Sequence, residues 1–343
     1  MDEYTTESIV LLDSIAAVRK RPGMYVGDTR DGSGLRVLLW EVVGNCVDEH
    51  LAARATGVRV CIEDQLVTVE DDGPGIPIDV VSDRGKTAIE IIFTELRASS
   101  GPKHPHVHIG ETLRGLGCVV ANALSKRLEV ETTRDGRRYR MVFERGRVVG
   151  ELTDLGETDR IGTWIRFDPD PEIFESVRWD LPLVRERLFD LACLDPGLVV
   201  VLNGETMQAP DGLAHWVRTH SGDPTADPIH LRGEHDGIRV EVALQWIDGD
   251  GVIMAWASHF RTLEGSHVHG FWEGLAEILA PGLTIEAARE HLEPGLVAAF
   301  HADIEDPRFG SPTRSRLDTP EAATAVAHVI RSQLPDLGRG SNG

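Results

Sequence analysis

The stretch Trp40-Glu41-Val42-Val43-Gly44-Asn45-Cys46-Val47-Asp48-Glu49 decides how the N-terminal half of the chain is organised. Apolar residues recur through it at spacings of three and four, which predicts a helix that begins at an N-cap Ser33 and stops before Gly57. Glu41, Asn45 and Asp48 fall within about one-sixth of a turn of each other, opposite the apolar side. Most such polar strips are solvated helix faces, so the neighbouring motifs must decide whether this one is a site.

The composition is that of a globular protein with room for two domains. Of 343 residues, 41% are hydrophobic and 27% are charged, and no run approaches the ~20 apolar residues of a membrane span. The N-terminus lacks a secretory signal, so we expect a cytoplasmic protein without membrane contact. A net charge of −21 excludes nucleic-acid binding through the average field, and Arg19-Lys20-Arg21 is too short a basic patch to serve alone.

The cysteines and histidines do not predict a metal site. Cys46, Cys61, Cys118 and Cys193 lie in apolar surroundings without a C-x-x-C pair, which indicates reduced core thiols. Three histidines alternate at His104, His106 and His108, but no carboxylate or thiol partner is evident near them.

Two alternating runs, residues 58–63 and 66–70, predict an antiparallel hairpin around Asp64-Gln65. The second run leads into Asp71-Asp72-Gly73-Pro74-Gly75-Ile76-Pro77. Gly-x-Gly leaves bare backbone that a flat ligand can approach, and the adjacent carboxylate can accept hydrogen bonds from an exocyclic amine. Taken alone, the segment is better interpreted as an ordinary Asp-Gly turn.

A long irregular segment over residues 98–114 follows an expected helix at 87–97, and segments of this length are typical of lids or disorder. Gly115-Leu116-Gly117 then opens a helix expected over residues 118–124. A glycine-rich loop at a helix N-terminus presents free N–H groups to phosphate, although a single Gly-x-Gly is weak evidence.

Further strands are expected at residues 128–133, 138–144, 148–152 and 162–167. The N-terminal half is therefore predicted to be α+β, with helices on one face of a mixed, mostly antiparallel sheet. Beyond it we expect helices at 181–194, 212–220, 271–279, 284–291 and 320–334, and strands at 199–202, 238–246, 252–259 and 297–304. Ser221-Gly222-Asp223-Pro224 is the linker candidate, giving domains at 1–220 (with an arm at 1–14) and 221–336, and a flexible tail at 337–343.

In this order, Glu-x-x-x-Asn on a helix, Asp-x-Gly-x-Gly at a strand end, a glycine-rich lid and Gly162-Thr163 on a later strand resemble the Bergerat-fold (GHKL) ATPases. That superfamily is shared by gyrase, Hsp90, histidine kinases and MutL. Within this superfamily, the similarity to the N-terminal region of gyrase and topoisomerase IV B subunits is close, and it extends to about residue 335. It is carried by residues 17–29, 71–77, 120–125 and 309–317. It implies a Bergerat-fold ATPase domain followed by a ribosomal-S5-like α/β transducer domain.

The resemblance implies an ATP and Mg²⁺ site. Glu41 would be the general base that polarises the attacking water, and Asn45 would hold Mg²⁺. Asp71 would accept from the adenine amino group beside Thr163, and Arg314 aligns with the family lysine that contacts the γ-phosphate. The other nucleotide contacts that it implies are Tyr4, Gly73, Gly75, Ile76, Thr112, Leu113, Arg114, Gly115, Leu116, Gly117 and Cys118.

The resemblance also implies a homodimer that closes on ATP through the N-terminal arm. Neither the family's TOPRIM domain nor its DNA-cleaving subunit is expected in this chain, so contact with DNA would require such a partner.

Several positions depart from the family pattern. Pro74 replaces an arginine, Gly44 replaces an aspartate, residues 110–115 lack paired glycines, and Pro312-Thr313-Arg314 replaces Gln-Thr-Lys. The altered lid and Arg314 favour, as an alternative, a nucleotide-sensing or gyrase-interacting regulator with little turnover. Intact Glu41 and Asn45 favour hydrolysis instead, because a pure binder needs no general base. A kinase-like use is not favoured, since no phospho-acceptor histidine domain or sensor region is present.

Overall fold

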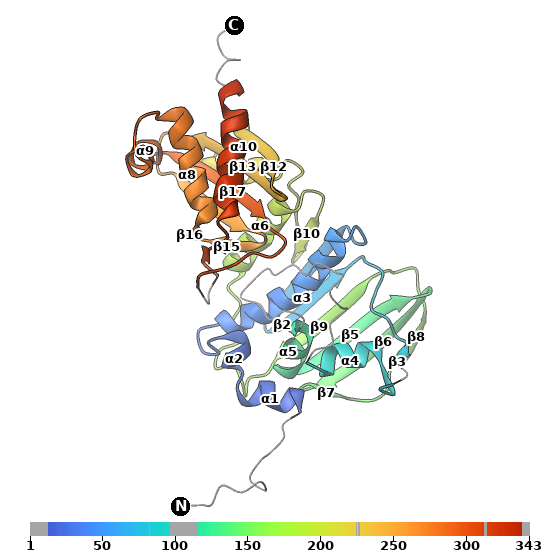
Figure 1. The fold of residues 1–343 in the computed structure, drawn as a ribbon. Coiled ribbons are helices and arrows are strands. Elements are labelled where there is room, and N and C mark those ends of the chain that lie inside the picture. The colour runs from blue at the N-terminus through green and yellow to red at the C-terminus, as the bar shows by residue number, and fades with distance from the viewer. Residues whose placement is uncertain are drawn as a thin grey trace, which may run out of the picture. The chain divides into compact units, whose positions relative to one another are not determined.

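The computed structural model describes residues 13–81, 83–96, 116–223, 225, 227–311 and 314–337, with side chains to residue 334. It divides the chain into two compact units, drawn in Figure 1. The first is Met1–Arg185 with Val200–Thr206, and the second is Glu186–Val199 with Met207–Gly343. An ATPase–transducer boundary near residue 220 stays a prediction.

The first unit is built on a nine-stranded sheet in the order β11-β10-β1-β2-β9-β5-β6-β7, with β8 paired to β6. Figure 1 shows α3, α4 and α5 together on one face of this sheet. The strands are β1 Gly57–Glu63, β2 Leu66–Asp71, β5 Ser125–Arg134, β6 Arg137–Glu144, β7 Arg147–Val148, β8 Thr153–Glu157, β9 Thr163–Pro169, β10 Val199–Leu202 and β11 Glu205–Met207. The remaining elements are α1 Ser14–Lys20, α2 Gly23–Val26, α3 Ser33–Leu51, α4 Ala88–Thr94, α5 Gly117–Ala123 and the small pair β3 Val80–Val81 with β4 Lys86–Thr87. The helix α6 Leu181–Leu194 begins in the first unit, and its residues from Glu186 onward belong to the second.

The hairpin of β1 and β2 is confirmed with the expected two-residue turn. Glu63 pairs with Leu66 and Val58 pairs with Asp71, so the register places Asp71 at the open end of the hairpin. β2 also pairs antiparallel with β9, which brings the start of β9 next to Asp71. The order of strands therefore assembles the site's polar turn from segments about ninety residues apart.

The helix α3 is buried on nearly all sides rather than amphipathic. It packs against α5 on one side and against β1 and β2 on another. Because α5 covers the polar strip, Glu41 is only 8% exposed, whereas Asn45 is exposed and Asp48 is half-buried. The strip is therefore not a uniformly solvated face.

Both predicted ends of α3 are wrong. Gly32, with φ 81°, is the N-cap, because the Ser33 N–H and hydroxyl both donate to Asp31 Oδ1, at 2.8 and 2.6 Å. The helix stops at Leu51, where Ala53 takes φ 56°, and Gly57 begins β1 instead of ending the helix.

The second unit is built on a five-stranded sheet in the order β12-β13-β17-β14-β15, with helices on both faces. Its elements are α7 Leu213–Ser221, β12 Ile229–His235, β13 Ile238–Trp246, β14 Val252–Ala257, β15 Phe260–Thr262, β16 Glu264–Gly265, α8 Ser266–Leu279, α9 Ile285–Leu292, β17 Leu296–Asp303, β18 Arg316–Leu317 and α10 Glu321–Leu337. The strand β12 is an element that the sequence pattern does not predict.

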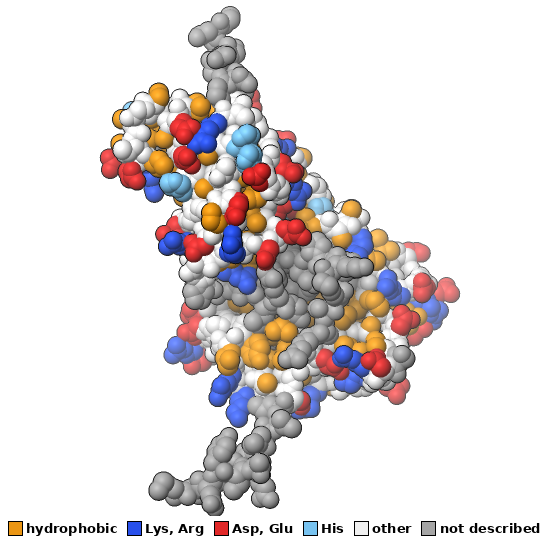
Figure 2. Space-filling model, viewed as in Figure 1, with side chains coloured by type: hydrophobic (Ala, Val, Ile, Leu, Met, Phe, Trp, Pro, Cys, Tyr) orange, Lys and Arg blue, Asp and Glu red, His pale blue; other side chains and the backbone are white. Residues whose placement is uncertain are grey.

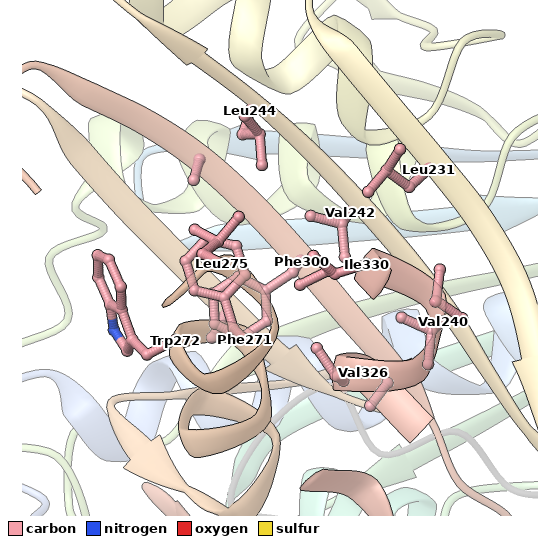
Figure 3. Close-up of a cluster of buried hydrophobic side chains, with 14 of the residues drawn as sticks. Leu231, Val240, Val242, Leu244, Phe271, Trp272, Leu275, Phe300, Val326 and Ile330 are labelled. Atoms are coloured by element: carbon pink, nitrogen blue, oxygen red, sulfur yellow. The ribbon is translucent and has the colours of Figure 1, made fainter. Parts of the chain in front are cut away.

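The core of this unit lies between the sheet and the pair α8 and α10, as Figure 3 shows. Phe271 of α8 stacks on Phe300 of β17 with ring centroids 4.3 Å apart. Glycines let the two helices approach: a Cβ at Gly270 would lie 2.2 Å from the Ala323 carbonyl oxygen. This seam fixes α10 directly over the sheet.

The charged surface is largely made of opposite charges in contact. On the face in Figure 2, Lys and Arg side chains are scattered among Asp and Glu side chains. Within the predicted basic patch, Arg19 donates to buried Asp170 at 2.7 Å and so has a structural partner. In the described part of the chain, no helix has the length and apolar character that crossing a membrane requires.

We predict that Phe271→Ala lowers the free energy of unfolding of the second unit by about 3–5 kcal/mol, since it leaves a cavity under α8. Leu279→Ala on the same helix, at a side chain that is 40% exposed, should cost far less. Chemical denaturation monitored by tryptophan fluorescence measures both. Equal losses would contradict the placement of the core.

Candidate active site

Glu41 lies against the first turn of α5. A Cβ added to Gly117 would lie 2.0 Å from Glu41 Oε2, so only glycine allows this approach of α5 to the carboxylate. The carboxylate thus sits at a helix N-terminus, where the backbone dipole favours negative charge. The helix predicted to follow Gly115-Leu116-Gly117 is confirmed and begins at Gly117, whereas Gly115 lies outside the described residues.

Asn45 follows Glu41 one helical turn later. Its Nδ2 donates to the Glu41 carbonyl oxygen at 2.8 Å and to Cys118 Sγ at 3.4 Å. Both contacts use the amide nitrogen, so neither engages Oδ1, a hard oxygen donor of the kind that Mg²⁺ prefers. Burial, followed by the charge of Glu41, raises the pKa of the Cys118 thiol to about 12, so this sulfur stays protonated at neutral pH.

Asp71 is a carboxylate at the end of β2 that is only 8% exposed. Its Oδ1 accepts the N–H groups of Gly73 at 2.8 Å and Thr163 at 3.2 Å. Among the described residues, the only hydrogen-bonding contact of Oδ2 is Cys46 Sγ, at 3.7 Å. Burial raises the pKa of Asp71 above its usual value, although the two backbone N–H groups oppose the shift.

The turn after Asp71 is anchored to β5. The Ile76 N–H donates to Thr132 Oγ1 at 2.7 Å, and the Thr132 hydroxyl donates back to the Ile76 carbonyl oxygen at 3.2 Å. Gly75 adopts φ 75°, and a Cβ there would lie 2.4 Å from the Thr133 carbonyl oxygen. The turn therefore presents bare backbone close to the sheet, as its Gly-x-Gly pattern predicts.

The second carboxylate of this turn, Asp72, has a different task. It accepts the N–H groups of Thr56 at 2.7 Å and Gly57 at 3.0 Å, and also the Thr56 hydroxyl. Burial acts to raise the pKa of Asp72, but these hydrogen bonds outweigh it and the pKa is lowered. Asp72 thus ties the start of β1 to the end of β2 and leaves Asp71 as the ligand candidate.

A small hollow adjoins Thr163 and Thr132 and is rimmed by the pairs Arg160–Glu70 and Arg138–Glu131. Neither Glu41 nor Asn45 lines it. We therefore place the candidate site by the hydrogen-bonding geometry around Asp71 and Asn45 rather than by this hollow.

The structure brings the predicted site residues into two neighbouring clusters. Glu41, Asn45, Leu116, Gly117 and Cys118 form one, where α3 meets α5. Asp71, Gly73, Gly75, Ile76 and Thr163 form the other, at the ends of β2 and β9. Cys46 of α3 connects them through its contact with Asp71.

Other predicted site residues lie elsewhere in the chain. Arg314 belongs to the second unit, in the loop before β18. Tyr4, Thr112, Leu113, Arg114 and Gly115 lie outside the described residues.

Sequence reasoning did not single out two residues of the site, Cys46 and Thr132. A signal existed for Thr132, since Leu128, Val130 and Thr132 alternate inward along β5 and a polar residue on a buried face needs a partner. No comparable signal marks Cys46, because a cysteine in an apolar helical pattern is indistinguishable from core packing.

Two family models match the chain. "Histidine kinase-, DNA gyrase B-, and HSP90-like ATPase" matches residues 30–172, and "DNA gyrase B" matches residues 212–337. The first range holds both clusters of the site, and the second holds most of the second unit.

Known proteins resemble the chain over almost its whole length. The DNA gyrase B protein of Archaeoglobus fulgidus is 38% identical over 96% of this chain and 55% of its own length. That of Thermotoga maritima is 35% identical over 98% and 57%. The chain thus spans about half the length of these relatives.

Solved structures of gyrase B and topoisomerase IV ATPase domains also resemble the chain over almost its whole length. The 43K ATPase domain of Thermus thermophilus gyrase B, solved with an aminocoumarin, matches with a TM-score of 0.78 and 30% identity, covering 96% of this chain and 91% of that one. A topoisomerase IV ATP-binding domain of Francisella tularensis, solved with a small-molecule inhibitor, matches with a TM-score of 0.75 and 25% identity, covering 97% and 94%.

We predict that Asp71→Asn leaves the protein at least as stable as the parent at neutral pH. A carboxyl whose pKa is raised on folding binds its proton more tightly in the folded state, so stability falls as pH rises from its ordinary pKa of 3.8 through the raised value. The asparagine Oδ1 still accepts from Gly73 and Thr163 but carries no charge.

Chemical denaturation of parent and variant at acidic and neutral pH measures this effect. As pH rises, the free energy of unfolding of the variant should increase relative to that of the parent. A variant that loses stability at neutral pH would show that the charge, rather than its removal, is needed for folding.

Proposed function

Because the chain belongs to the DNA gyrase B family of histidine kinase-, gyrase B- and HSP90-like ATPases, we propose that it binds ATP with Mg²⁺ at these two clusters and acts as a two-chain clamp. Family membership gives the Bergerat-type α+β fold, the transducer domain and an ATPase module like that of type IIA topoisomerase B subunits. The metal, the residue roles and the clamp are the proposal.

The observation that carries the proposal is the hydrogen bonding of the buried Asp71 carboxylate. Among the described residues, its Oδ2 contacts only the thiol of Cys46, which is a weak donor. Such an oxygen is suited to accept a hydrogen bond from a stronger donor. The exocyclic amine of adenine is such a donor, and the bare backbone at Gly73 and Gly75 allows a flat base to approach. Thr163, held to the same carboxylate through its N–H, would lie beside the base.

Asn45 fits a magnesium site. Mg²⁺ in nucleotide sites takes one or two protein oxygens together with phosphate oxygens and water, and Asn45 is exposed with its amide nitrogen already engaged. Bound there, the ion would neutralise charge that develops on the phosphates.

Glu41 would orient the water that attacks the γ-phosphorus while the bond to the bridging oxygen of ADP breaks. Phosphoryl transfer depends mainly on placement, so a carboxylate fixed against Gly117 and joined to Asn45 through its carbonyl oxygen suits this task. The main-chain N–H groups of Leu113 to Gly117 would hold the phosphates, and Thr112 and Cys118 would lie beside them.

The remaining proposals concern assembly. Tyr4 and the arm would cover the nucleotide of a second copy, and Arg314 would contact the γ-phosphate. DNA would be handled only together with a cleaving, TOPRIM-containing partner. Free thiols at all four cysteines agree with a reducing, cytoplasmic location.

We predict that Glu41→Gln binds ATP with nearly the parent's affinity and loses hydrolysis by about 100-fold or more, because the amide keeps the shape but cannot accept the water's proton. Calorimetry and phosphate release measure the two effects. Asp71→Asn is the matched comparison, since it should weaken binding of the nucleotide. Parental turnover by Glu41→Gln would rule out this base.

We predict that the rate of phosphate release with Mg·ATP rises with the second power of protein concentration, because two chains must meet to close the clamp. A first-order dependence would contradict clamp-coupled turnover. Measurable ATP binding without release would favour the alternative of a nucleotide-sensing regulator.

A further inference from the structure

The guanidinium of Arg314 lies on an aromatic platform made of Phe260 and Phe309. Its Cζ is 4.6 Å from the centroid of Phe260 and 5.9 Å from that of Phe309, both within the ~6 Å range of a cation–π contact. The two rings support each other edge to face, with centroids 5.1 Å apart. Phe260, at the start of β15 (Figure 1), is only 6% exposed, so the platform has a fixed base.

The loop that carries Arg314 is also held by hydrogen bonds. The N–H of Arg314 donates to the Ser311 carbonyl oxygen at 3.0 Å, and that of Ser315 donates to Ser311 Oγ at 3.1 Å. The Ser315 carbonyl oxygen accepts from the Leu263 N–H at 2.8 Å, which connects the loop to the chain between β15 and β16.

Arg314 itself takes φ 54°, a backbone conformation that a non-glycine residue keeps only when its surroundings determine it. The backbone and the side chain of this residue are therefore both constrained.

We propose that Phe260, backed by Phe309, is a positioning residue that orients Arg314 for contact with the γ-phosphate. This inference rests on the proposed function. Stacking uses the flat π face of a guanidinium, whereas its N–H donors lie in the plane and point outward. The platform therefore suits the arginine that stands here where the family that the chain resembles carries lysine, because a guanidinium can lie on a ring and still direct several N–H donors toward phosphate.

The test compares a non-hydrolysable ATP analogue with ADP, because only the analogue has a γ-phosphate. Phe260→Leu should weaken the analogue about two- to fivefold, the effect of a partly exposed cation–π contact, and leave ADP affinity unchanged. Phe260→Tyr keeps the ring and should bind as the parent does. Phe309→Leu should have a smaller effect, since its ring is farther from Arg314.

Two further variants separate positioning from general damage. In an Arg314→Ala background, Phe260→Leu should cause no additional loss of analogue affinity, because the residue that it positions is gone. Leu263→Ala is the matched control: the residue is 83% exposed and keeps its backbone N–H contact with Ser315, so neither affinity should change. If a thermal unfolding experiment shows that the Phe260→Leu variant is not folded, Phe309→Leu is used for the same test.

The possible failures are distinguishable. A parent that does not bind the analogue more tightly than ADP would overturn the γ-phosphate contact and with it the proposed function at Arg314. If the parent prefers the analogue over ADP and Phe260→Leu binds the analogue as tightly as the parent does, only the positioning role of Phe260 is overturned. Equal losses for analogue and ADP would show a merely structural role and also overturn it.

Discussion

The contact between Glu41 and Gly117 constrains the whole first unit. A carboxylate on a buried helix is costly unless it meets polar groups, and here it lies against the first turn of α5, an approach that residue 117 allows because it has no side chain. The close approach fixes α5 against α3 and sets Cys118 beside Asn45. The nine-stranded sheet then supports α3 from its other side, so that Asp71 meets the same helix through Cys46. Both ends of the candidate site are thus attached to one helix.

The second unit is held together mainly by apolar packing between its helices and its sheet. Its central strand β17 is buried almost throughout, because α8 and α10 cover one face of the sheet and α7 lies on β13 and β17. Apolar side chains fill the core of this unit. Where α8 meets α10, Gly270 and Gly274 allow the two helices to come close together. In this apolar setting the guanidinium of Arg314 lies over the ring of Phe260.

Local patterns were enough to predict most of the fold. The β1–β2 hairpin, α6 and the strands β5, β6, β9, β10, β13, β14 and β17 follow from alternation, turn residues and helical spacing. β12 was missed because Ile229-His230-Leu231-Arg232-Gly233 has few apolar residues and an interior glycine, which suits a sheet edge but weakens the strand signal. The burial of Glu41 could not be predicted, since helical periodicity does not tell whether a polar strip faces water or another helix.

The absence of a side chain at Gly117 has a genetic consequence. Every missense change at this codon adds atoms where the carboxylate of Glu41 already lies, so a substitution should force the Glu41 side chain or α5 to move. Rotating the Glu41 side chain away, or shortening it to aspartate, would relieve most of this overlap but would withdraw the proposed base from its place. Substitutions at positions 41 and 117 are therefore expected to show strong epistasis, so that a change at one position is tolerated only together with a change at the other.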